Sequence, residues 1–88
     1  MNFTVTSNVD VTKAVIELGG HKVGYILRQA SGAHQLRLAV RKNSNIMDPP
    51  PYKWKIISDT FQTQAAAVAW LEEHSELLIK NLELYPLD

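Results

Sequence analysis

One amphipathic stretch constrains the fold of this chain more than any other feature of the sequence. Between residues 63 and 82 the apolar side chains recur at intervals of three and four, which places them along one side of a helix. The residues on this side are Ala67, Trp70, Leu71, His74, Leu77, Leu78 and Leu82. Such a helix must pack against an apolar surface, and the chain before it reads as β-structure. The stretch therefore predicts one C-terminal helix packed on one face of a sheet.

Five segments have the alternation and the composition of β-strands. They span residues 2–7, 12–18, 21–28, 34–41 and 52–57. The pair Gly19-Gly20 and the loop around Gly32 predict tight hairpins, because glycine accepts the positive φ angles that such turns need. The predicted fold class is α+β, with one antiparallel sheet of four to five strands and one C-terminal helix packed on one face. We expect residues 1–88 to form a single domain.

Strand alternation also predicts which side chains face the helix. The expected inward residues are Ala14, Ile16, Leu18, Val23, Tyr25, Leu27, Leu36, Leu38, Val40, Tyr52, Trp54 and Ile56. With the helix in place, we expect Trp54, Phe61, Trp70 and Leu71 to be among the most buried side chains.

The start of the helix can be read in two ways. Asp59 and Gln62 have the spacing of a capping box, whereas Thr63 can serve as the N-cap. We favour Thr63, because Phe61 can then pack against the core just before the helix. The three prolines that end residues 43–51 cannot donate ladder hydrogen bonds, so we expect that segment to be an exposed loop.

Composition limits the functional classes. The chain has no cysteine, which excludes a disulfide framework and a cysteine-ligated zinc site. No apolar run approaches the ~20 residues of a membrane span, and the N-terminus lacks a signal-peptide pattern. The three histidines show no metal-binding spacing, and the carboxylates of Glu72, Glu73 and Glu76 should be solvated. We therefore expect a cytoplasmic protein that is not an enzyme, with no cofactor, no metal and no membrane partner.

Charge is distributed unevenly, although the formal net charge is zero. Residues 20–56 carry seven lysines and arginines and one aspartate, whereas residues 57–88 carry one lysine and six acidic residues. The predicted sheet is therefore basic and the predicted helix acidic. Such an asymmetry can mark a surface that binds an anionic partner.

Six cations occupy strand positions opposite to the expected inward residues. They are Lys22, Arg28, Arg37, Arg41, Lys53 and Lys55. This pattern predicts that they share the uncovered sheet face and bind an anionic partner, either nucleic acid or an acidic protein surface. The same pattern leaves that face without aromatic side chains on which bases could stack.

The junction between the last strand and the helix resembles that of a known group of DNA-binding modules. F-Q-T-Q-A-A-A-V-A-W, residues 61–70, matches the pattern F-x-T-x-x-x-A-x-x-W after a basic strand. It is similar to the sheet-plus-helix modules of phage-type tyrosine integrases and plant AP2-type domains, a likeness that covers about residues 22–74. This resemblance implies a sheet presented to the DNA major groove. The matched positions are Trp54, Phe61, Thr63, Ala67 and Trp70.

Two functional hypotheses follow. In the first, the chain is a small non-catalytic module whose basic sheet face binds nucleic acid, with DNA favoured. In the second, it is a protein-interaction or inhibitor domain that covers the surface of a partner protein. The build is also similar to that of small phage-encoded inhibitor proteins, which use a bare sheet and a helix in this way.

Overall fold

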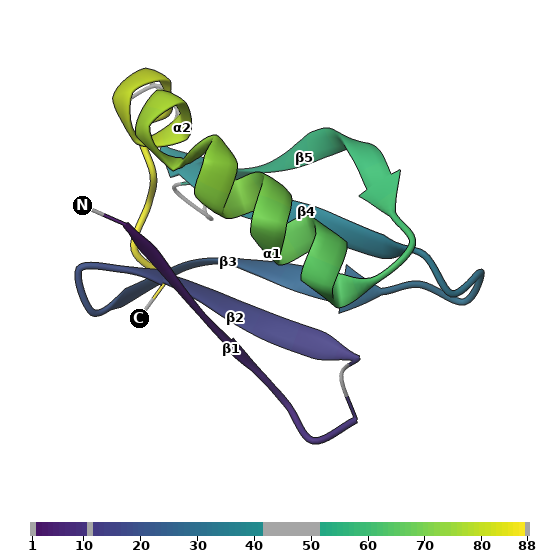
Figure 1. Ribbon diagram of the computed structural model, residues 1–88. Helices are drawn as coiled ribbons and strands as arrows, with labels where there is room; N and C mark the ends of the chain where they lie inside the picture. Colours follow the sequence, from purple (N-terminus) through teal and green to yellow (C-terminus); the bar gives the residue numbers. More distant parts are fainter. Residues whose placement is uncertain (1, 11, 42–51, 88) are drawn as a thin grey trace.

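The computed structural model describes residues 2–10, 12–41 and 52–87. Within these residues an antiparallel meander of five strands, in the order β1-β2-β3-β4-β5, is followed by two helices on one face (Figure 1). The elements are β1 (Phe3–Ser7), β2 (Lys13–Leu18), β3 (His21–Arg28), β4 (His34–Arg41), β5 (Tyr52–Phe61), α1 (Gln64–Glu73) and α2 (Ser75–Asn81). The predicted α+β class is confirmed. The prediction for residues 43–51 lies outside the described residues.

The turns between the strands form where the glycines predict them. Gly19 and Gly20 have φ angles of 62° and 86°, and they join β2 to β3. Gly32, with φ of 90°, lies in the loop between β3 and β4. Because L-residues with a Cβ rarely adopt such angles, these glycines fix the two hairpins.

Thr63 is the N-cap of α1, as predicted. Its backbone is extended, and its hydroxyl oxygen accepts a hydrogen bond from the Ala66 N–H at 3.1 Å. The expectation of one continuous helix is wrong at His74, where the backbone angles leave helical values and separate α1 from α2. The His74 ring stacks on Trp70 at a centroid distance of 4.2 Å, and its Nδ1 lies 2.9 Å from the Trp70 carbonyl oxygen. Within the described residues, both helices are too short to span a bilayer.

The core lies between the sheet and α1. Its large, fully buried side chains are Ile16, Ile26, Leu36, Leu38 and Leu71. Ala67 is also fully buried, and its small side chain lets α1 approach the sheet closely. Leu71 is buried as predicted, whereas Phe61 and Trp70 are half-buried at the rim of the core.

A β-bulge shifts the alternation of β3. Ile16 pairs with Gly24 and Glu17 pairs with Lys22, so Val23 is an extra residue between them. Val23, the bulge residue itself, joins the core, and so does Ile26 further along the strand. The expectation that Tyr25 and Leu27 face the helix is therefore wrong, because the bulge changes which residues point inward.

The alternation of β5 is also opposite to the prediction. Ile57 and Phe61 pack with the core, while Lys55 pairs with Leu38 and therefore shares the helix side of the sheet. The other residues of this strand, Tyr52, Trp54 and Ile56, then lie on the opposite face. Trp54 is 38% exposed, so the expectation that it is deeply buried is wrong.

Residues 83–87, which we call the tail, leave α2 and return to the sheet. In Figure 1 they form the yellow segment that runs from α2 toward the C-terminus. Leu84 forms an isolated antiparallel bridge with Val40, and its side chain packs against the core. The tail therefore lies beside the end of β4, next to residues of β4 that do not pair with β3.

Candidate functional site

The sheet face opposite α1, which we call the open face, carries the candidate site. The strand register and the Leu84 bridge place these residues on it: Thr4, Thr6, Lys13, Val15, Glu17, Lys22, Tyr25, Leu27, Gln35, Arg37, Ala39, Arg41, Tyr52, Trp54, Ile56 and Tyr85. Every strand and the tail contribute to the face. It combines aromatic and cationic side chains, which alternation in the individual strands did not predict.

Four rings form a continuous row across this face, from β3 through β5 to the tail. The Tyr25 and Trp54 centroids are 5.7 Å apart, and the Trp54 and Tyr52 centroids are 5.6 Å apart with an edge-to-face geometry. Tyr52 stacks on Tyr85 at 5.3 Å, with an angle of 22° between the ring planes. We call Tyr25, Trp54, Tyr52 and Tyr85 the aromatic row. Contacts of this kind stabilise a pair by about 0.5–1.5 kcal/mol beyond the area that they bury.

The row holds its rings in place and leaves part of their surface in water. Ala39 is fully buried although it lies on the open face, because Trp54 pairs with it on one side and the tail lies on the other. Trp54 keeps 38% of its surface exposed and the neighbouring Ile56 keeps 50%. The face is therefore ordered by packing yet still offers aromatic and apolar surface to a partner.

Cations accompany the row along its length. The Lys13 Nζ lies 4.3 Å from the centroid of the Tyr25 ring, a cation–π contact. Arg37 is paired with Tyr25 on one side and with Ile56 on the other. Its Nε donates a hydrogen bond to the Gln35 Oε1 at 2.7 Å, which orients the guanidinium along the strand.

The six predicted cations do not share one face, and this expectation is corrected. Arg37 and Arg41 lie on the open face, and Lys22 joins them through its pairing with Glu17. The other three lie on the helix side, because each pairs with a residue of that side: Lys53 with Val40, Lys55 with Leu38, and Arg28 with His34. Both lysines and Arg28 are exposed there.

The expectation of an open face without aromatic side chains is also wrong. The residues that sequence reasoning missed are Lys13, Tyr25, Tyr52, Trp54 and Tyr85. One signal was available for β5: Ile57 and Phe61 are four positions apart and so share a face of the strand, and their joint packing against the core places Trp54 and Ile56 on the other face. No comparable signal exists for Tyr25, because its orientation depends on the bulge at Ile16 and Glu17.

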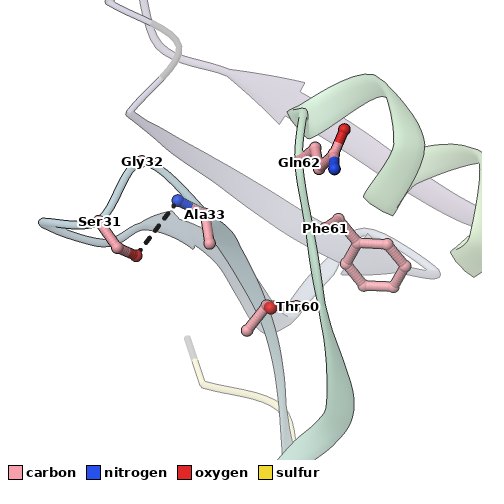
Figure 2. A pocket seen from close by; sticks show the side chains of 6 residues that line it. All are labelled: Ser31, Gly32, Ala33, Thr60, Phe61 and Gln62. Carbon is pink, nitrogen blue, oxygen red and sulfur yellow. Dashed lines mark hydrogen bonds between the residues drawn. The ribbon is translucent and has the colours of Figure 1, made fainter.

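A pocket of about 280 Å³ lies elsewhere, between the β3–β4 loop and the end of β5 (Figure 2). Its lining residues are Ser31, Gly32, Ala33, Thr60, Phe61 and Gln62. The Ser31 hydroxyl oxygen lies 3.5 Å from the Ala33 N–H, which donates to it. None of these six side chains is titratable, and the pocket is at the opposite end of β5 from Trp54. It therefore lies apart from the aromatic row, although Thr60 pairs with Gln35 of the open face.

Metal-ligating side chains do not cluster in the part of the chain that the structure describes. His34 is buried on β4, whereas His74 is half-buried against Trp70 on the helix. The candidate site is therefore described by its rings and cations.

Comparison with protein-family models, with curated proteins and with solved structures found no match to this chain.

Proposed function

We propose that this chain is a small non-catalytic module whose open face binds single-stranded nucleic acid. The observation that carries the proposal is the aromatic row with cations beside it. Proteins that bind single strands commonly combine aromatic side chains, on which bases stack, with a positively charged surface that follows the backbone. The open face offers both kinds of group on one rigid sheet.

Trp54 is the base-stacking residue at the centre of the row. Its indole is 38% exposed, and its contacts with Tyr25 and Tyr52 fix its orientation before a ligand arrives. Stacking of a base on an aromatic side chain contributes about 1–3 kcal/mol. Tyr25 has a different role, because the Lys13 ammonium already occupies one side of its ring.

Phosphate contacts come from the cations of the same face, Lys13, Lys22, Arg37 and Arg41. The register also places Glu17 on this face. In the tail, Glu83 lies on the same face as Tyr85, because Leu84 between them points to the helix side. Among the described residues the face therefore carries a small positive excess, although the whole chain is neutral. For three or four phosphate contacts to a single strand, the logarithm of the affinity should fall with the logarithm of salt concentration with a slope of about −2 to −3.

Two charge reversals with equal formal charge change test this proposal. Arg37→Glu alters the open face, whereas Lys55→Glu alters the helix side of the sheet. We expect Arg37→Glu to weaken binding of a labelled single-stranded oligothymidine about tenfold, because it removes a phosphate contact and adds repulsion. Lys55→Glu should change the affinity less than about twofold, apart from weak long-range effects. Fluorescence anisotropy at several salt concentrations measures the affinity of both variants.

Further arms of the experiment define the class of nucleic acid. Trp54→Leu should lower the affinity about tenfold with little change in salt slope, because it removes stacking and no charge. A blunt duplex of the same length should bind more weakly, since its bases are not available for stacking. Equal losses for Arg37→Glu and Lys55→Glu, or no binding by the wild-type protein, would contradict the proposal.

A protein partner is the second candidate, and the exposure of Ile56 favours it. Half of this side chain is exposed beside Trp54 and Arg37, and Trp, Tyr and Arg are the residue types that dominate protein–protein hot spots. In this alternative the chain acts as an interaction or inhibitor domain that covers a partner's surface. Such a complex would depend on Ile56 and would weaken less steeply with salt than nucleic-acid binding.

A further inference from the structure

The tail pairs with the part of β4 that is not paired with β3. The last pair between β3 and β4 is Gly24 with Leu38, so residues 39–41 of β4 are not paired with β3. The tail lies along these residues: the Arg41 N–H donates to the Glu83 carbonyl oxygen at 2.8 Å, and the Tyr85 N–H donates to the Ala39 carbonyl oxygen at 2.8 Å. These are the bonds of an added antiparallel strand.

The end of the tail then reaches the other side of the gap. The Leu87 N–H donates to the Lys22 carbonyl oxygen in β3 at 2.7 Å. Pro86, between the two donors, has no N–H, so no donor is left unpaired at that residue. The tail therefore connects the end of β4 to the beginning of β3.

Docking of the tail places its two central side chains on opposite faces of the sheet. Leu84 packs with the core on the helix side, opposite Val40. Tyr85 lies on the open face and stacks on Tyr52. Without the docked tail, Tyr52 would lose its stacking partner, and Ala39 would lose one of the groups that cover it.

We propose that the docked tail completes the nucleic-acid-binding face and that Tyr85 is one of its base-stacking residues. The inference rests on the proposed function of the open face. Because a ligand that contacts Tyr85 binds the docked form more tightly than the undocked form, ligand binding and tail docking stabilise each other by the same factor. Tail docking is thus a means of regulating the site.

Full-length variants separate the ring from the backbone contacts. Tyr85→Ala keeps the N–H but removes the ring, and Tyr85→Phe keeps a ring able to stack. We expect Tyr85→Ala to weaken binding of a labelled single-stranded oligothymidine about fivefold or more, and Tyr85→Phe to bind as the wild type does. Leu87→Pro removes the hydrogen bond to Lys22 without altering a ring, and it should lower the affinity by weakening docking.

Hydrogen exchange measures docking directly. The amide protons of Tyr85 and Leu87 should exchange more slowly when the oligothymidine is added to the wild-type protein, because binding favours the docked tail. Thermal unfolding of each variant shows whether the fold is intact. If Tyr85→Ala does not fold, Leu87→Pro and the exchange rates of the wild type decide the question.

The outcomes for the tail and for the proposed function can be told apart. The role of the tail would be overturned if folded Tyr85→Ala bound the oligothymidine as tightly as the wild type does. It would also be overturned if bound ligand left the exchange rates of the Tyr85 and Leu87 amides unchanged. In both cases the proposed function of the open face would still stand. If the wild-type protein binds no oligothymidine, the proposed function fails and the inference fails with it. Slower exchange together with weaker binding of Tyr85→Ala and Leu87→Pro supports both.

Discussion

At the scale of single residues, Gly24 shows how the absence of a side chain affects the position of the candidate site. A Cβ at this position would overlap the Arg37 carbonyl oxygen and would lie 2.9 Å from the Leu38 Cδ2. Gly24 is also the residue that follows the bulge in β3 and pairs with Ile16. The absence of a side chain at this point allows β3 and β4 to approach each other while Tyr25 and Arg37 are paired on the open face.

Substitution of Gly24 should therefore destabilise the sheet. We expect Gly24→Ala to lower the free energy of unfolding by about 1–3 kcal/mol, because the added methyl group must displace backbone atoms. Urea denaturation measures the loss. Gly19→Asn is the matched control: nothing lies within 4 Å of a Cβ there, and asparagine tolerates the left-handed backbone of the turn. Equal stability of Gly24→Ala and the wild type would show that β3 can move away at no cost.

At the scale of elements, the N-cap residue Thr63 sets the start of α1. The Thr63 hydroxyl satisfies the Ala66 N–H, one of the donors that the first turn of a helix leaves without a partner. This single bond fixes the start of the helix that buries Ala67 and Leu71 against the sheet.

Removal of this cap should cost stability without rearranging the fold. Thr63→Ala should lower the free energy of unfolding by about 1 kcal/mol, and Thr63→Ser should restore most of it because serine keeps the hydroxyl. Thermal or urea unfolding of the three proteins provides the comparison. A Thr63→Ser variant as unstable as Thr63→Ala would indicate that the methyl group of threonine, not its hydroxyl, matters.

The elements also show how far the sequence determines the fold. The hairpin glycines, the Thr63 cap and the alternation of β4 depend on neighbouring residues in the chain, so they could be predicted. The orientations of Tyr25 and Trp54 could not be predicted in this way. The first depends on a bulge set by pairing between β2 and β3, and the second on where Ile57 and Phe61 meet the core. The break between α1 and α2 at His74 could not be predicted either, because neither glycine nor proline occurs there.

At the scale of the whole molecule, the two faces of the sheet differ in the side chains that they carry. One face is covered by α1 and contributes Ile16, Ile26, Leu36 and Leu38 to the core. The other carries the aromatic row, to which the tail contributes Tyr85. The candidate site includes Arg37, Arg41 and Lys22 from the six predicted cations, but the aromatic part of the site required the three-dimensional register.

The two tryptophans of the chain allow the most direct test of the central claim, because they lie on different sides of the molecule. Trp54 is on the open face, whereas Trp70 is on α1 and contacts Phe61 and His74. Addition of a single-stranded oligothymidine to isotope-labelled protein should shift the NMR signals of the Trp54 indole N–H and of the Arg37 and Tyr85 amides. The Trp70 indole signal should stay in place. A titration that leaves the Trp54 signal unchanged, or that moves the Trp70 signal instead, would contradict the assignment of binding to the open face.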